Sequence, residues 1–172
     1  MKKIAFCIIL IAISLLSFAG CGMNYNAVMY SNAQKWMTDE YLRENRVRAY
    51  YLKDDDYVGD EDDWGNYFWD ESSPSSRIVI ISQQEEIDKN FKETPFEVDF
   101  EREIIILYFF GSSGLKDYKL KRIDLEEQTL NIYFKYDKNN PYVKDSVSLY
   151  QRCLMIKLDK IEFDTVNFIE QR

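Results

Sequence analysis

The sequence predicts an α+β fold, with a mainly antiparallel sheet or a small open barrel packed with one or two helices. Three observations support this fold class. A strand-like run at 77–82 leads into a helix-like run at 82–91, and residues 103–111 (EIIILYFFG) form a continuous apolar run typical of a central strand. The runs at 117–125 and 130–136 alternate and are joined by a short turn, which favours antiparallel neighbours.

The N-terminal helices and strands are expected as follows. Residues 32–42 predict a helix capped by Asn32, because their apolar side chains recur at spacings that share one face: Trp36, Met37, Tyr41 and Leu42. Residues 46–52 fit either a strand or a further helical turn. In the helix at 82–91, Ser82 and Glu85 have the spacing of a capping box.

The C-terminal half is predicted to consist of strands. Residues 126–129 are expected to form a hairpin turn, and the strand after it has a buried face with period two: Leu130, Ile132, Phe134 and Tyr136. After an Asn-Asn-Pro loop, residues 148–159 read as another strand, and 165–170 as the last one. One principal domain accommodates all these elements.

The N-terminus has the three parts of an export signal. Met1 to Lys3 provide positive charge, residues 4–18 are apolar apart from two serines, and Ala19 and Gly20 are small. This stretch is short for a membrane-spanning helix, which needs about 20 apolar residues. We therefore expect a signal peptide at 1–20, a tether at 21–31 and a single domain at 32–172.

Residues 18–21 (FAGC) resemble the lipobox of bacterial lipoproteins, in which a lipid is attached to the cysteine thiol and cleavage leaves that cysteine first. The resemblance implies that Cys21 is the lipid attachment site and that the protein is anchored at the extracytoplasmic face of the cell membrane. This chain has Phe18 where the family usually has leucine. The alternative is an ordinary secretory signal with a cysteine just past the cleavage site.

Charge and composition exclude several classes of function. The chain has 22 basic and 30 acidic residues, and removal of the signal takes away Lys2 and Lys3, leaving 20 against 30 and a net charge of −10. Nucleic acid is therefore not an expected partner, and an anionic membrane would repel the body of the protein, so that the lipid must hold it. Cys153, within an apolar strand-like run, is expected to be buried and inert.

The sequence contains no histidine. Its absence excludes histidine-dependent nucleophilic triads and histidine-ligated zinc. We expect no enzyme activity and no cofactor, although a hydrolase that uses only carboxylates stays possible.

Residues 54–76 form an acidic segment interleaved with aromatic residues. In one register, five of them match positions 1, 3, 6, 8 and 12 of a calcium-loop template: Asp60, Asp62, Gly65, Phe68 and Glu71. Trp64, at position 5, offers no side-chain oxygen. The segment is therefore interpreted as a solvated loop, as a weak calcium site that uses Asp60, Asp62 and Glu71, or as an aromatic surface for a partner with a basic patch.

The order of elements from residue 77 onward resembles the protease-complex-subunit domain, a small β-rich module of bacterial exported proteins and lipoproteins. The resemblance is carried by the strand–helix start, the runs at 98–114 and 118–136, Pro141, and the strand that contains Cys153. In the family, glycine and tyrosine follow the central strand together, whereas here three residues separate Gly114 from Tyr118. The resemblance implies a non-catalytic binding or accessory module with a protein partner in the cell envelope. A calcium-binding surface domain is the alternative.

Overall fold

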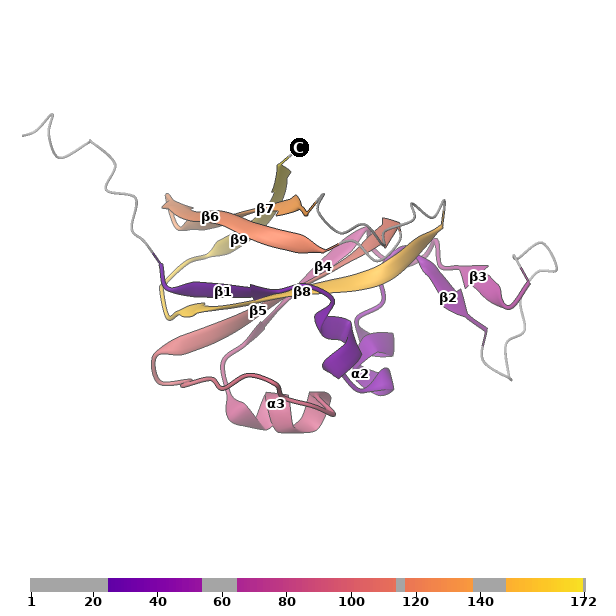
Figure 1. Cartoon of the computed structure of the whole chain (residues 1–172), viewed down its shortest axis with the longest axis horizontal. Helices are drawn as coiled ribbons and strands as arrows, with labels where there is room; N and C mark the ends of the chain where they lie inside the picture. Colours follow the sequence, from indigo (N-terminus) through magenta and orange to yellow (C-terminus); the bar gives the residue numbers. More distant parts are fainter. Residues whose placement is uncertain (1–24, 54–64, 114–116, 138–147, 172) are drawn as a thin grey trace, which may run out of the picture.

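The computed structural model describes residues 25–53, 65–113, 117–137 and 148–171, which form a larger sheet, a smaller sheet and a helical layer (Figure 1). The larger sheet has the order β3-β2-β8-β5-β4, with β1 also beside β8. Its strands are β1 (Ala27–Tyr30), β2 (Tyr50–Leu52), β3 (Tyr67–Trp69), β4 (Ser76–Ile81), β5 (Glu103–Ser113) and β8 (Leu149–Asp159).

The smaller sheet has the order β6-β7-β9 and consists of β6 (Tyr118–Glu126), β7 (Thr129–Tyr136) and β9 (Thr165–Gln171). The helical layer contains a 3₁₀ helix, η1 (Ala33–Trp36), and two α-helices, α2 (Asp39–Glu44) and α3 (Gln84–Asn90). The predicted α+β class is confirmed, with open sheets rather than a closed barrel. Most strand pairs are antiparallel, but β2 runs parallel to β8, and β9 runs parallel to β7.

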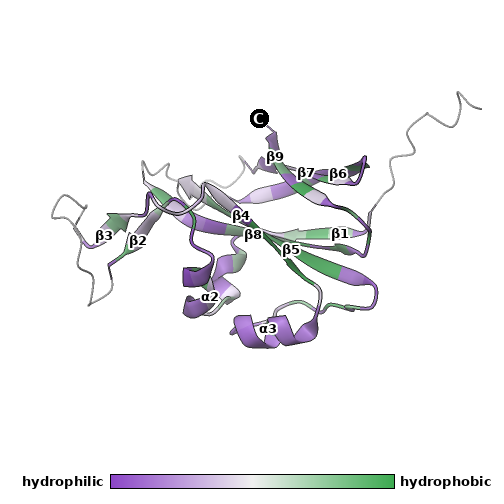
Figure 2. Ribbon diagram, turned by 180° about the vertical axis from the view of Figure 1, so that it is seen from behind, coloured by the Kyte–Doolittle hydropathy of each residue, from purple (hydrophilic) through white to green (hydrophobic). Residues whose placement is uncertain are grey.

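The larger sheet lies between two apolar cores, so its two central strands are buried on both faces. Ile104 and Ile106 of β5 pack into the inter-sheet core against the smaller sheet, whereas Ile105 and Leu107 pack into the helix-side core. Figure 2 shows the green, apolar stretches of β5 and β8 between the helices and the smaller sheet. This arrangement explains the continuous apolar run in β5, since a strand covered on both faces needs no polar alternation.

The expected tether at 21–31 extends too far. Ala27 to Tyr30 form β1, which pairs antiparallel with β8 from Leu158 back to Met155. The backbone N–H of Asn26 also donates to Asp159 Oδ2 at 3.2 Å. The described part of this segment thus belongs to the sheet, because it supplies an edge strand for β8.

The single helix expected at 32–42 is two short helices. Met37 has an extended backbone between them, and Thr38 caps α2 by accepting a hydrogen bond from the Tyr41 N–H at 3.3 Å. Threonine is more favourable at an N-cap than inside a helix, so a second helix begins after Thr38. Asn32 adopts a left-handed conformation without a capping bond, and its side chain instead donates to Asp117 Oδ1 at 3.0 Å.

Two further local expectations are corrected. The capping box of Ser82 and Glu85 is not formed: Gln83 is the cap residue of α3, and the Ser82 N–H donates to Glu86 Oε2 at 3.2 Å. Of residues 46–52, only Tyr50–Leu52 form a strand. Because α3 starts one residue later than the spacing suggested, Glu86 rather than Glu85 lies at the third position after the cap residue.

Candidate ligand-binding pocket

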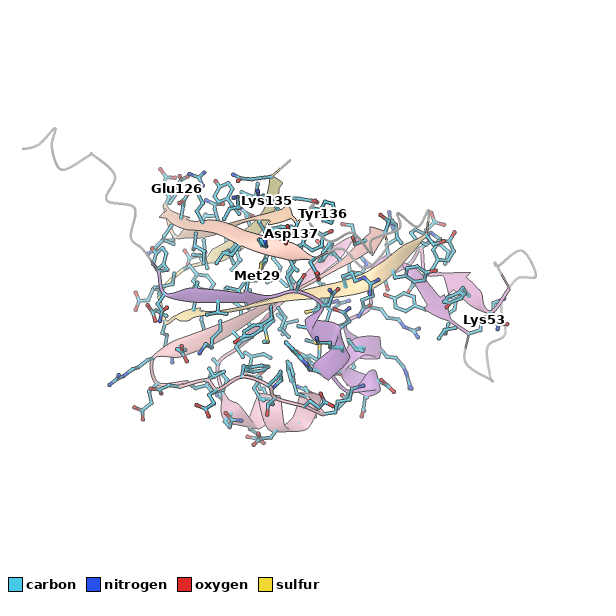
Figure 3. The ribbon with its side chains drawn as sticks, viewed as in Figure 1. Met29, Lys53, Glu126, Lys135, Tyr136 and Asp137 are labelled. Atoms are coloured by element: carbon cyan, nitrogen blue, oxygen red, sulfur yellow. The ribbon has the colours of Figure 1, made fainter. Side chains whose placement is uncertain are left out.

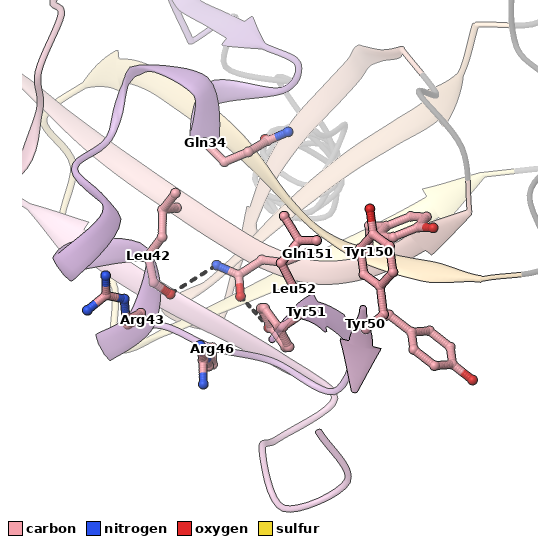
Figure 4. Close-up of a pocket in the computed structure, with 10 residues that line it drawn as sticks. Gln34, Leu42, Arg43, Arg46, Tyr50, Tyr51, Leu52, Tyr150 and Gln151 are labelled. Carbon is pink, nitrogen blue, oxygen red and sulfur yellow. Dashed lines mark hydrogen bonds between the residues drawn. The ribbon is translucent and has the colours of Figure 1, made fainter. Parts of the chain in front are cut away.

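The described residues enclose an open pocket of about 330 Å³ where α2, β2, β3 and the start of β8 meet (Figure 4). We call it the tyrosine–arginine pocket, because four tyrosines and two arginines are among the residues that line it. The lining residues are Gln34, Leu42, Arg43, Arg46, Tyr50, Tyr51, Leu52, Tyr67, Tyr150 and Gln151. It lies at the end of the larger sheet that carries β2 and β3, away from the start of β1 (Figure 1).

Strand pairing brings the tyrosines together from distant parts of the sequence. β2 pairs in parallel with β8 at Tyr50 and Tyr150, and antiparallel with β3, where Leu52 faces Tyr67. The Tyr67 and Tyr150 rings meet edge to face, with centroids 5.9 Å apart. The tyrosines of the pocket are therefore held by hydrogen-bonded strands rather than by a loop.

The Tyr51 hydroxyl joins β2 to β8 and to the segment that follows α2. It accepts a hydrogen bond from the Val47 N–H at 2.9 Å, and it lies 2.7 Å from the Val47 carbonyl and 2.5 Å from Gln151 Oε1. A hydroxyl has one proton, so it donates to one of these two acceptors at a time. Gln151 Nε2 in turn donates to the Leu42 carbonyl at 3.2 Å (Figure 4).

Burial raises the pKa of Tyr51 to about 12, because the phenolate would lose its solvation there. The phenol is therefore neutral at physiological pH. It acts as a hydrogen-bonding link from β2 to Val47 and to β8 rather than as a base.

Two guanidinium groups flank the tyrosines. Arg46 lies 4.7 Å from the centroid of the Tyr51 ring and 5.4 Å from that of Phe68, at cation–π distances. Its Nε atom is buried and has no hydrogen-bond partner in the described ranges. Arg43 lies exposed in the last turn of α2. An anionic group entering the pocket would meet both positive charges.

The calcium-loop prediction falls largely outside the described residues, since Asp60 and Asp62 lie in the range 54–64 that is not described. Phe68 lies within strand β3, and Glu71 is exposed. Asp70 accepts hydrogen bonds at 2.8 Å from the hydroxyls of both Ser72 and Ser73. Within the described ranges no group of three or more potential metal-ligating residues occurs, and the calcium site stays a prediction.

The two cysteines expected in the mature chain have different outcomes. Cys21 lies outside the described residues, so its lipidation stays a prediction. Cys153 is fully buried in the helix-side core, as expected, and burial raises the pKa of its thiol well above the ordinary value. A buried, protonated thiol is a poor nucleophile.

Sequence reasoning missed the pocket. The run at 46–52 contains Arg46, Tyr50 and Tyr51, but its partner Tyr150 is about a hundred residues away, and only the parallel pairing of β2 with β8 joins them. The one local signal was the presence of two arginines and two adjacent tyrosines in that run.

No protein-family model matches the chain, and no curated protein and no solved structure matches it. The resemblances to lipoproteins and to the protease-complex-subunit domain therefore stay predictions. No helix in the part of the chain that the structure describes is long and apolar enough to cross a membrane.

Proposed function

We propose that this protein is a lipid-anchored, non-catalytic binding module at the extracytoplasmic face of a bacterial cell membrane, and that it binds a protein partner of the envelope through the tyrosine–arginine pocket. The observation that carries the proposal is the convergence of four tyrosines and two arginines on one open pocket. Tyrosine and arginine are among the side chains that most often dominate the binding energy of protein interfaces.

The chemistry of the lining supports binding rather than catalysis. The ten lining residues include no carboxylate, thiol or serine, and the pKa of Tyr51 is raised away from the range of a general base. A volume of about 330 Å³ lies at the lower end of small-molecule pockets. It suits one or two side chains of a partner.

The charges indicate which side chains fit. Arg43 and Arg46 would attract a carboxylate, while the rings of Tyr67 and Tyr150 would pack against an apolar or aromatic group beside it. We therefore expect the partner segment to carry an acidic residue next to an apolar one.

Site-specific photo-crosslinking in intact cells tests partner binding. A photoreactive residue in place of Leu52, which is 60% exposed at the pocket, should give a discrete protein adduct. The same probe in place of Val28, 44% exposed on β1, should not. Arg43→Glu should remove the Leu52 adduct, whereas Lys89→Glu, the same charge change on an exposed position of α3, should keep it. Equal adducts at Leu52 and Val28 would refute the pocket as the binding site.

Membrane fractionation tests the anchor separately. In the proposal, the lipid on Cys21 holds the mature chain on the membrane, and two acyl chains make such anchoring stable. Cys21→Ser should therefore move the protein from the membrane fraction to the soluble fraction or block its processing. Unchanged membrane association and unchanged mass of the mature chain would refute lipidation.

A further inference from the structure

The outer face of the smaller sheet is basic, although the chain as a whole has a net charge of −8. Four cationic side chains gather there on β6 and β7, and we call this surface the basic face: Lys119, Lys121, Arg122 and Lys135. Lys135 is labelled in Figure 3, at the end of β7. The opposite side of the same two strands packs into the inter-sheet core, so that the basic face points away from the larger sheet.

A β-bulge adds Arg122 to the basic face. Leu120 faces Phe134 and Ile123 faces Ile132, so two residues, Lys121 and Arg122, occupy the place of one opposite Tyr133. In an unbroken strand Arg122 would point into the core. The bulge resets the alternation, which puts Arg122 beside the Tyr133 ring, 4.1 Å from its centroid, and leaves Lys121 on the same face.

Half of this positive charge is not neutralised by neighbouring acids. Lys119 pairs with Asp137 at 2.7 Å, and Arg122 pairs with Asp124 at 3.3 Å. In the described ranges neither Lys121 nor Lys135 has an ion-pair partner. The pKa of Lys121 is lowered, first by the charge of Lys135 and also by that of Lys119, because like charges on neighbouring ammonium groups repel one another. Such a cluster favours an anion that can approach all of them together.

The smaller sheet lies beside β1, the first strand after the expected membrane anchor. β6 contacts β1, and the Tyr118 N–H at the start of β6 donates to Ser31 Oγ just past the end of β1, at 2.9 Å. Tyr25, the first described residue, packs against the inter-sheet core. Three residues separate it from Cys21, which limits the distance between the two Cα atoms to about 14 Å.

We propose that the basic face docks onto anionic phospholipid headgroups of the membrane that carries the anchor, and that it thereby orients the domain. This inference rests on the proposed lipid on Cys21. Basic residues near a membrane are attracted by anionic lipid over about one Debye length. A short tether holds the domain close enough for the basic face to reach the surface by rotation. The tyrosine–arginine pocket lies at the end of the larger sheet that carries β2 and β3, so it would lie to one side of the docked face (Figure 1).

Lysine acylation on vesicles tests the docked orientation. The chain from residue 21 onward contains every described helix and strand, and Cys21 can be coupled to a maleimide lipid while Cys153 is buried. On vesicles of equal parts phosphatidylglycerol and phosphatidylcholine, acylation of Lys121 and Lys135 should be about tenfold slower than on phosphatidylcholine alone. Lys89 on α3 should react equally on both, and high salt should remove the difference.

A double substitution, Lys121→Glu with Lys135→Glu, shows whether the basic face itself is responsible. In this variant Lys119 should be acylated at the same rate on both kinds of vesicle, whereas a control with Lys89→Glu and Lys92→Glu should still show slow acylation of the basic face. Equal rates on the two kinds of vesicle in the unsubstituted chain, or a difference that survives the double substitution, would overturn the proposal. Chemical coupling replaces the cellular lipid, so failure here is distinguishable from failure of the Cys21→Ser fractionation.

Discussion

Tyr51 makes the stability of the fold depend on pH above the physiological range. The pKa of Tyr51 is raised from 10.0 to about 12, mainly by burial, and that of Tyr41 is raised in the same way. In the unfolded chain these phenols lose their protons first, so the free energy of unfolding should fall as pH rises from about 10 to about 12. Denaturant titrations at several pH values across this interval measure the fall.

Tyr51→Phe isolates the contribution of one phenol. At neutral pH this variant should be less stable by about 1 to 2 kcal/mol, because the Val47 N–H and the Gln151 side chain lose their partner. Its loss of stability above about pH 10 should be shallower than that of the unsubstituted chain. Parallel curves for the two proteins would mean that Tyr51 ionises in the folded state as it does in the unfolded one.

The hairpin between β6 and β7 has a turn whose backbone does not suit its residues. Glu127 and Gln128 have φ angles of 45° and 65°, a pair of positive values that favours asparagine and glycine. Gln128→Gly should therefore raise the free energy of unfolding by about 1 kcal/mol. The carbonyl of residue 128 accepts hydrogen bonds from the backbone N–H groups of Asp164 and Thr165, and the substitution does not remove these bonds.

A matched glycine at a neighbouring position controls for chain entropy. Glu126, the last residue of β6, is exposed, and its φ is not among the positive values. Glu126→Gly should lower the free energy of unfolding by about 0.5 to 1 kcal/mol. If both glycine variants destabilise the protein, the turn is not strained in the way we infer. Chemical denaturation of the three proteins side by side decides between the two outcomes.

Local patterns predicted the type of most elements but not the places where two patterns compete. The apolar runs at 103–111 and 148–159 form β5 and β8, because a strand that is buried on both faces needs a continuous apolar run. The run at 117–125 was expected to alternate, but Leu120 and Ile123 are three residues apart, and only a bulge puts both in the core. A cap-forming residue inside an apolar pattern, Thr38, likewise divided one expected helix into two.

Long-range pairing was beyond the reach of these patterns, and it decides both the architecture and the candidate site. β9 runs parallel to β7 although the runs from 103 onward suggested successive antiparallel hairpins, and β1 joins the sheet from a segment expected to be a tether. The tyrosine–arginine pocket depends on the same kind of contact, between Tyr50 and Tyr150. Such pairings become visible only when the register between distant strands is known.

The larger sheet couples the two cores, so we expect the described fold to unfold as one unit. β5 and β8 contribute alternate residues to both cores, and loss of packing on either side should therefore weaken both. Ile132→Ala, in the inter-sheet core, and Ile87→Ala, in the helix-side core, should each cost about 2 to 5 kcal/mol, because both side chains are almost completely buried.

Two probes report on the two sides of the larger sheet. Trp36 packs against the helix-side core, and its fluorescence can be isolated by replacing Trp64 and Trp69 with phenylalanine, while circular dichroism follows the strands. If unfolding is cooperative, Ile132→Ala shifts the Trp36 transition and the strand transition to the same lower denaturant concentration. If the Trp36 transition stays in place while the strand transition shifts, the smaller sheet unfolds independently. In that case the basic face and the tyrosine–arginine pocket would belong to parts of different stability.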